Sequence, residues 1–249
     1  MARYKTGVVF LHAQKCGGSS LETALFQHYR LSRERILPIE ARYAVRSINH
    51  GPNSSLPETE ASIERQFLLA YALQRGVKCV TGHAPFDRAL QQQYGDTHKF
   101  ITILREPVER FCSHLRYAYD SGMETSAGAD IDAFLDSRRA RYFGGLYAYH
   151  FGDWRDPDTP VMRKHIDDAR QNILGLDAVG YLDRLPVFLE EINAFLGAKI
   201  VMGHQNKTTE RKTSFRGDFT PAQMEKIRKL CAPSMEIYET VREKRPPFP

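Results

Sequence analysis

No stretch of this sequence approaches the roughly 20 consecutive apolar residues that a helix needs to cross a bilayer. The apolar run at residues 7–11, GVVFL, is also too short for the core of a signal peptide, and Lys15 follows soon after it. We therefore expect no membrane span and a cytoplasmic location. The sequence remains compatible with a truncated lumenal domain.

Cysteine is scarce, and its spacing does not indicate a metal site. The four cysteines form no CxxC pair, and no cluster of histidines accompanies them. Short cysteine spacings are the usual mark of zinc and redox sites. The sequence therefore predicts no metal and four reduced thiols, at least three of them buried: Cys16, Cys79, Cys112 and Cys231.

Runs of basic residues are also missing. The net charge of +5 comes from Lys and Arg residues that are spread along the chain. This pattern is typical of a solvated surface, so we predict no nucleic-acid partner. A mild basic excess still suits a small anionic ligand such as a nucleotide or a sulfated glycan.

The 249 residues fit one α/β domain that spans positions 1–249. Short apolar runs rich in β-branched residues are typical of strands buried on both faces of a parallel sheet. Such runs alternate here with helical patterns, which predicts a mostly parallel central sheet flanked by helices. The predicted strands are 7–11, 78–81, 100–104 and 178–182, and the predicted helices are 20–29, 58–75, 107–119, 161–174, 185–196, 221–230 and 233–243.

Two long stretches are predicted to be loops. Residues 31–57 and 122–158 are rich in turn-forming residues. A more local prediction concerns the first helix: Ser19 and Glu22 have the spacing of a capping box, so that helix should begin near Ser20.

The segment at residues 12–20, HAQKCGGSS, joins the first strand to the first helix. Its two glycines let main-chain amides approach a phosphate closely, and the helix N-terminus adds a positive dipole. Lys15 adds a mobile charge and the two serines add hydroxyl donors. The lysine precedes the glycines, so this is not the GxxxxGK[ST] motif of nucleoside-triphosphate enzymes. An ordinary strand-to-helix turn with a surface lysine is the alternative.

A second segment, residues 105–113 with the sequence REPVERFCS, follows the apolar run at 100–104. Arg105 leaves the carboxyl end of that predicted strand, where ligands of open α/β sheets bind. Arg110 and Ser113 are three residues apart and share a helix face, which suits a phosphate. The alternative is an arginine at a sheet edge and a solvated serine.

Together the two segments resemble the sulfotransferases that use 3′-phosphoadenosine-5′-phosphosulfate (PAPS), particularly the carbohydrate and heparan-sulfate branch. That family carries H-x-x-K-x-G-G-[ST]-[ST] and later R-[DE]-P-x-x-R-x-x-S, and both patterns are present here in order. Weaker matches at 82–83, 179–184 and 236–238 extend the resemblance over nearly the whole chain. We expect a bacterial member of the family.

The resemblance implies a donor site in two parts. The first segment would bind the 5′-phosphosulfate, and the second would bind the 3′-phosphate. PAPS carries its own activated sulfate, so no metal is required. The implied donor-binding residues are Lys15, Cys16, Gly17, Gly18, Ser19, Ser20, Arg105 and Ser113. Cys16 departs from the threonine more typical of the family, and we expect its thiol to lie beside the donor.

The catalytic residues expected are Lys15 and His83. In-line transfer builds charge on the leaving phosphate oxygen, which Lys15 would stabilise. A base must take the proton of the acceptor hydroxyl, and His83 suits that role by its pKa range. The heparan-type branch has a catalytic histidine in a comparable Gly-His segment. His12 competes but is expected to pack beneath the loop, and Glu106 is the next candidate.

The acceptor is not fixed by the sequence. A carbohydrate hydroxyl is expected first, with a phenol or a small metabolite also compatible. Six aromatic residues between Tyr142 and Trp154 either line the acceptor site or belong to the core, and basic residues 207–218 either close over the adenosine or form a solvated loop.

Two other functions stay open at this point. One is a phosphotransferase that uses a nucleoside triphosphate, which the lysine position and the lack of an evident magnesium site disfavour. The other is a non-catalytic protein of the same fold that binds a nucleotide or an anionic glycan. The oligomeric state is not indicated.

Overall fold

The computed structural model describes residues 4–37, 58–120, 130–202 and 219–246. At the centre of this part of the chain lies a five-stranded sheet in the order β2-β3-β1-β4-β5, in which every neighbouring pair is parallel. The predicted α/β fold with a parallel central sheet is therefore confirmed. The strands are β1 (Gly7–Leu11), β2 (Arg33–Ile36), β3 (Cys79–Gly82), β4 (His98–Leu104) and β5 (Ala178–Tyr181).

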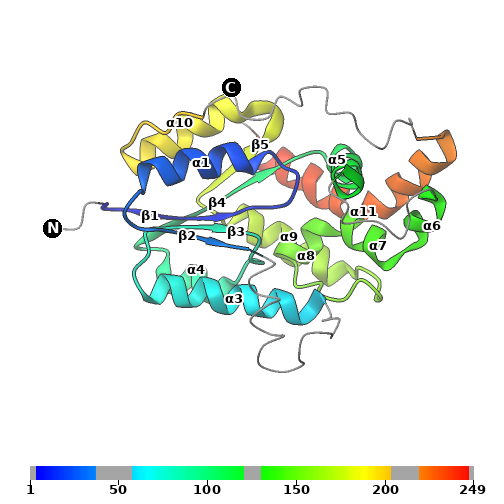
Figure 1. The fold of residues 1–249 in the computed structure, drawn as a ribbon, viewed down its shortest axis with the longest axis horizontal. Helices are drawn as coiled ribbons and strands as arrows, with labels where there is room; N and C mark the ends of the chain where they lie inside the picture. Colours follow the sequence, from blue (N-terminus) through cyan, green and yellow to red (C-terminus); the bar gives the residue numbers. More distant parts are fainter. Residues whose placement is uncertain (1–3, 38–57, 121–129, 203–218, 247–249) are drawn as a thin grey trace.

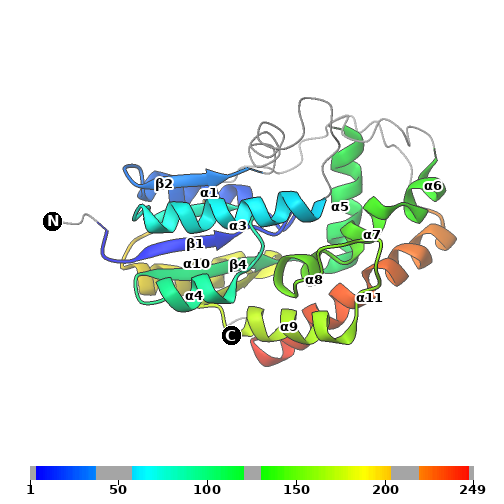
Figure 2. The same cartoon turned by 90° about the horizontal axis from the view of Figure 1, so that it is seen from below.

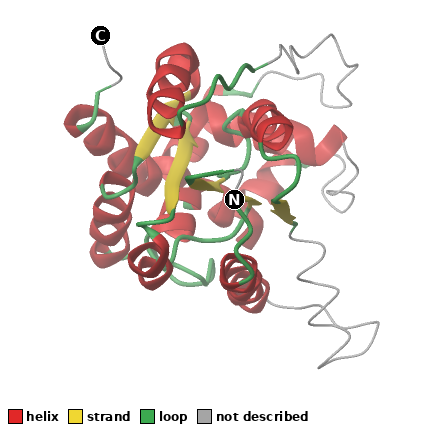
Figure 3. Ribbon diagram, turned by 90° about the vertical axis from the view of Figure 1, so that its left-hand side faces the viewer, coloured by secondary structure: helices red, strands yellow, loops and turns green. Residues whose placement is uncertain are grey.

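Helices cover both faces of the sheet, as Figures 1 and 3 show. One face is covered by α1 (Gly18–His28) and α10 (Leu185–Leu196), and the other by α3 (Glu58–Gln74) and α4 (Arg88–Tyr94) (Figure 1). The sheet is thus enclosed on both sides, which agrees with the fully buried residues of β1, β3 and β5.

The remaining helices gather at the end of the sheet toward which the strands run (Figures 1 and 2). The longest of them, α11, contacts each of the other five. They are α5 (Pro107–Asp120), α6 (Ile131–Asp136), α7 (Arg138–Gly144), α8 (Leu146–Phe151), α9 (Arg163–Leu174) and α11 (Pro221–Lys244), and a short 3-10 turn at Leu182–Arg184 precedes α10. This helical group lies beside the carboxyl ends of the strands.

Most predicted elements are present. The bounds of β1 and α10 are those predicted, and the other predicted strands and helices differ by a few residues, except at the C-terminus. All four cysteines are free thiols, with Cys16, Cys79 and Cys231 buried and Cys112 partly buried, as predicted.

The predicted loop at 31–57 is wrong at its start, where β2 forms the edge of the sheet. The sequence of β2 is RERI, and only Ile36 is buried. An edge strand has one paired side, so charged side chains are tolerated there and no apolar run marks it. Helix α4 was not predicted either; Asp87 caps it by accepting from the amide of Leu90 at 3.0 Å.

The predicted loop at 122–158 is also wrong within the described residues, which contain three short helices. Side chains of Asp130 and Ser137 cap α6 and α7 by accepting from main-chain amides. The aromatic residues of this region belong to the core rather than to an open site, because all are nearly inaccessible: Tyr142, Phe143, Tyr147, Tyr149, Phe151 and Trp154.

The two predicted C-terminal helices are one helix, α11, with Pro233 in its interior. A proline removes one main-chain donor from a helix, which usually ends or kinks it. Here tertiary packing holds the helix together beside the proline. Ser234 is fully buried, and its hydroxyl donates to the carbonyl of Gly144 at 2.6 Å.

Among the described residues, none of the helices is both long enough and apolar enough to cross a membrane.

Candidate active site

The predicted loop and Arg105 follow neighbouring strands. The loop follows β1, Arg105 follows β4, and these two strands pair in parallel at the centre of the sheet. From β1 the chain continues to β2 at one edge, and from β4 it continues to β5 at the other. In open α/β sheets, ligands bind outside the carboxyl ends of strands at such a switch point. Both predicted segments therefore border the expected crevice.

The start of α1 lacks a side-chain cap at its N-cap position. Gly17 is the N-cap residue in a left-handed conformation with a φ of 77°, and no side chain caps the first turn. That turn also lacks an acidic residue. Lys15 has a φ of 64°, which is strained for a residue with a side chain. Uncapped amides at a helix N-terminus attract anions, so this turn suits a phosphate group.

The predicted capping box is wrong, because α1 begins at Gly18 instead of near Ser20. Glu22 is buried on the inner face of the helix. Its carboxylate accepts a hydrogen bond of 2.7 Å from the hydroxyl of Thr81 and forms an ion pair with Arg35. The side chain of Glu22 therefore ties α1 to strands β2 and β3.

His12 packs beneath the loop, as expected. Its ring is buried and stacks on Phe10 with the ring centroids 5.2 Å apart. A Cβ atom on Gly18 would lie 2.4 Å from Cδ2 of His12, so a side chain at position 18 would force the buried ring of His12 to shift. Burial lowers the pKa of His12 to about 3. His12 is therefore neutral and too weakly basic to compete as the proton acceptor.

Two cations face the same region from the two segments. Nζ of Lys15 lies 4.0 Å from the centroid of the Tyr117 ring. Burial, followed by the charge of Arg105, lowers the pKa of Lys15, although Asp120 opposes the shift. Nε of Arg105 is 3.4 Å from Glu109, a long contact. An anion between Lys15 and Arg105 would relieve their repulsion, so the pair suits a polyanionic ligand.

Cys16 departs from the expectation of a thiol beside the donor. Its side chain is fully buried, and Sγ lies 3.6 Å from the hydroxyl of Tyr147. Burial raises the pKa of this thiol. The thiol points into the core, so that expectation is wrong and only the main chain of Cys16 is available to a ligand.

The two polar residues predicted on α5 do not share one environment. Ser113 is half-buried on the helix that follows Arg105. Arg110 is completely buried and donates a hydrogen bond to the carbonyl of Phe143. Arg110 is therefore held in the core, and its Nε and Nη1 atoms have no hydrogen-bond partner among the described residues. A phosphate contact shared by Arg110 and Ser113 stays a prediction.

His83 lies at the end of β3, which pairs in parallel with β1. Its Nδ1 atom is 2.6 Å from the carbonyl oxygen of His12, the first residue of the loop. A carbonyl only accepts, so Nδ1 carries the proton and Nε2 is left as the basic atom. The structure thus brings His83 and the loop to the same edge of the sheet. Glu106 is already engaged, because its carboxylate caps α5 at the amide of Glu109.

Burial lowers the pKa of His83 below 6.5, and further charges modify it. The hydrogen bond to His12 raises the pKa, as does the more distant Glu22. The cations of Arg65 and Arg35 lower it. His83 is therefore neutral near pH 7, which is the form that a general base needs.

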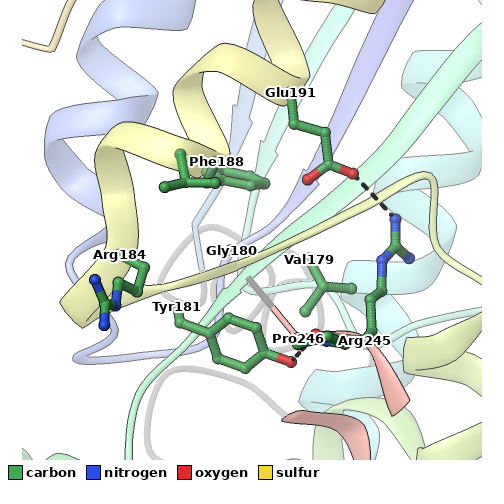
Figure 4. Close-up of a pocket in the computed structure, with 9 residues that line it drawn as sticks. Val179, Gly180, Tyr181, Arg184, Phe188, Glu191, Arg245 and Pro246 are labelled. Carbon is green, nitrogen blue, oxygen red and sulfur yellow. Dashed lines mark hydrogen bonds and ion pairs between the residues drawn. The ribbon is translucent and has the colours of Figure 1, made fainter. Parts of the chain in front are cut away.

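Two cavities among the described residues lie away from this site. One of about 30 Å³, roughly the space of a single water molecule, lies between β5 and α10 (Figure 4). Arg245 and Glu191 form an ion pair of 3.3 Å at its side. A groove of about 650 Å³ lies at the opposite, amino-terminal edge of the sheet, next to Lys5 and Arg30. Neither has the placement expected for ligands of this fold.

Metal-ligating side chains do not cluster in the part of the chain that the structure describes. Among these residues there is no group of three His, Cys, Asp or Glu side chains that could hold an ion. The basic loop at 207–218 lies outside the described residues.

Sequence reasoning missed Tyr147, Glu22 and Arg35 as parts of this site. Tyr147 lies in the aromatic stretch whose role was left open, and its hydroxyl contacts both segments of the site. No local pattern marks Arg35, since β2 itself was not predicted. The signal at Glu22 was assigned to a helix cap instead of to a buried ion pair.

Comparison with solved structures shows a likeness in fold. No protein-family model matches the chain, and no curated protein matches its sequence significantly. Among solved structures, a sulfotransferase from Alicyclobacillus acidocaldarius is similar, with a TM-score of 0.50 and 19% sequence identity. The likeness covers 98% of this chain and 96% of that protein. It shows that the two proteins share a fold over nearly their full length.

Proposed function

We propose that this chain, over residues 1–249, is one sulfotransferase domain that moves a sulfuryl group from PAPS to an acceptor hydroxyl. The observation that carries the proposal is the placement of Lys15 and Arg105 at the central switch point, beside the uncapped N-terminus of α1. The full-length fold likeness to a protein named a sulfotransferase supports it.

The donor would be bound from both of its ends. Main-chain amides from Cys16 to Ser20 would hold the 5′-phosphosulfate, since glycine geometry and the helix N-terminus suit an anion there. Arg105 would hold the 3′-phosphate by charge-assisted hydrogen bonds, with the hydroxyl of Ser113 as a second donor. These contacts neutralise the ligand without a metal ion.

The transfer step would use Lys15 and His83. The donor supplies an activated sulfuryl group, and a bond forms between the acceptor oxygen and sulfur as the bond to the phosphate oxygen breaks. Lys15 would stabilise the charge that builds on that phosphate oxygen. His83 would take the acceptor proton at Nε2, because its Nδ1 proton is committed to His12.

We infer a carbohydrate hydroxyl as the first acceptor to test, in keeping with the resemblance of the two motifs to the carbohydrate and heparan-sulfate branch. Phenols and small metabolites are the next acceptors. The buried aromatic residues between Tyr142 and Trp154 do not argue for any of these, because they form the core.

A thermal-shift series tests the donor. The protein is heated with 3′-phosphoadenosine-5′-phosphate (PAP), ATP or GTP, each with magnesium and with EDTA. We expect PAP to raise the melting temperature most, and equally with and without magnesium. Stabilisation by ATP or GTP that requires magnesium would favour a phosphotransferase instead. Transfer of labelled sulfate from PAPS to an acceptor panel then distinguishes an enzyme from a non-catalytic binder.

A further inference from the structure

Tyr147 connects the loop that follows β1 to Arg105, which follows β4. It lies in α8, beyond the carboxyl end of β4 (Figure 2), and its side chain is fully buried. Its hydroxyl accepts a hydrogen bond of 2.8 Å from the amide of Arg105 and donates one to the carbonyl of the same residue. The same oxygen lies 3.6 Å from Sγ of Cys16.

The proton and one acceptor position of this hydroxyl are both used at Arg105: the hydroxyl donates to the carbonyl of Arg105 and accepts from its amide. The thiol of Cys16 lies against the same oxygen at 3.6 Å, and it also approaches the carbonyl of Gln14 at 3.7 Å. Burial raises the pKa of Tyr147 well above its usual value, which keeps the phenol protonated and able to donate. No other hydroxyl contact to the main chain of Arg105 occurs among the described residues.

The contact is placed where the sheet no longer fixes the chain. Arg105 comes directly after Leu104, the last residue of β4, so the ladder of strand hydrogen bonds ends there. In place of a neighbouring strand, the hydroxyl of Tyr147 forms hydrogen bonds with both the amide and the carbonyl of Arg105. Within the described ranges, the side chain of Arg105 forms only a long contact with Glu109. The position from which its guanidinium extends therefore depends on Tyr147.

The loop and the segment that begins at Arg105 each carry a cation, so a contact that holds them together must act against charge repulsion. The charge of Arg105 lowers the pKa of Lys15, so the cations repel each other when no anion lies between them. Cys16 is the residue next to Lys15 in the loop. A single uncharged hydroxyl that contacts Cys16 and Arg105 opposes the separation of the two segments.

We propose that Tyr147 is a positioning residue that sets the spacing between the loop and Arg105, and thereby the discrimination in favour of a nucleotide with both a 5′- and a 3′-phosphate. This inference rests on the proposed function, since it assigns the two phosphates to these two segments. It makes a residue of the aromatic core responsible for ligand specificity without contact with the ligand.

The test is the variant Tyr147→Phe, which keeps the ring and removes the hydroxyl. Its matched control is Tyr29→Phe, because the hydroxyl of Tyr29 is also on a buried ring and donates to a main-chain carbonyl, that of Thr6, at the amino-terminal edge of the sheet. Binding of PAP and of adenosine 5′-phosphate (AMP) is measured by calorimetry for the wild type and both variants. Thermal unfolding of the two variants shows whether each is folded at the assay temperature.

We expect Tyr147→Phe to lower the ratio of PAP affinity to AMP affinity by about tenfold, the equivalent of one hydrogen bond. Tyr29→Phe should leave the ratio unchanged. If Tyr147→Phe keeps the wild-type ratio of PAP affinity to AMP affinity, the role proposed for Tyr147 is overturned while the proposed function stands. A wild type that binds PAP and AMP equally would overturn the proposed function together with this inference.

Hydrogen exchange gives a second reading of the same variant, independent of ligand. The amide of Arg105 should exchange at least about tenfold faster in Tyr147→Phe than in the wild type, because its hydrogen-bond acceptor is gone. The amide of Phe100, which donates to Asp177 at the other end of β4, should be unaffected. Equal exchange of Arg105 in both proteins would contradict the proposal.

Discussion

The Nδ1 atom of His83 lies 2.6 Å from the main-chain oxygen of His12, so the loop itself fixes the tautomer of the candidate base. The two residues are brought together because β1 and β3 are parallel neighbours, with Leu11 opposite Gly82. A histidine held in this way presents Nε2 to a substrate while its other nitrogen is occupied. This hydrogen bond joins the loop after β1 to the candidate proton acceptor.

The variant His83→Ala tests that assignment. We expect sulfuryl transfer to fall by about 10²–10⁴-fold, the usual size of a general-base contribution. PAP affinity should be nearly unchanged, since His83 is assigned to the acceptor. The control is His28→Ala, a histidine at the amino-terminal edge of the sheet. Activity of His83→Ala near that of the wild type would remove His83 from the mechanism.

The pH dependence follows from the environment of His83. Burial and the nearby arginines lower its pKa, so its neutral, active form persists below pH 6.5. Activity should therefore fall on acidification, with a midpoint of kcat/KM below 6.5. A midpoint at or above 6.5 would contradict the assigned base.

Arg35→Gln should move that acidic midpoint toward higher pH. The cation of Arg35 lowers the pKa of His83, while its ion-pair partner Glu22 raises it. Loss of Arg35 removes the cation that lowers the pKa of His83 and leaves Glu22 without its ion-pair partner, so both changes raise that pKa. Arg33→Gln, two residues away on the same strand, is the control and should leave the pH profile in place. The comparison requires only initial rates across a pH series.

Lys15→Ala should lower kcat by about 10²–10³-fold and weaken PAP binding by less than about tenfold. The reason is that the charge Lys15 stabilises is largest in the transition state. Initial-rate kinetics for PAPS combined with PAP calorimetry separates the two effects. An increase in the KM for PAPS at unchanged kcat would make Lys15 a ground-state binding residue.

Gly18→Ala should disturb the loop because the new Cβ atom would lie 2.4 Å from the ring of His12. We expect a loss of about 1–3 kcal/mol in unfolding free energy, the range of an overpacked core, and weaker PAP binding. Gly175→Ala is the control: its φ is −82° and its nearest neighbour would be 3.3 Å away. Urea unfolding curves of the two variants give the comparison, and equal stabilities would show that the loop tolerates the side chain.

The fold was predictable where local pattern and tertiary structure agree. The run GVVFL became β1 because it is fully buried in the centre of the sheet. The sequence did not predict β2 because an edge strand needs few apolar residues. It predicted two helices in place of α11 because the contact that supports the helix beside Pro233, from Ser234 to Gly144, joins residues remote in sequence. The order of the strands follows from long-range pairing that no local window contains.

The cations of the candidate site were predictable from the sequence, but the buried contacts that hold its two segments in place were not. Motif spacing identified Lys15 and Arg105, and their strands do lie side by side. The inward direction of Cys16 and the link through Tyr147 depend on the packing of α8, a helix that the sequence pattern did not predict. Tyr147 is 131 positions from Cys16 and 42 from Arg105, so these contacts require the three-dimensional structure.

The proposed donor site is tested most directly by calorimetric titration of the protein with PAP and with AMP in EDTA, for the wild type and Arg105→Ala. We expect a Kd for PAP of about 1 μM or below in the wild type, with AMP binding much more weakly. Arg105→Ala should weaken PAP by about 10- to 100-fold and leave AMP unchanged, because only the contact with the 3′-phosphate is lost. The control Arg30→Ala, at the opposite edge of the sheet, should match the wild type. Equal affinity of the wild type for PAP and AMP would contradict a donor site in which Arg105 binds the 3′-phosphate.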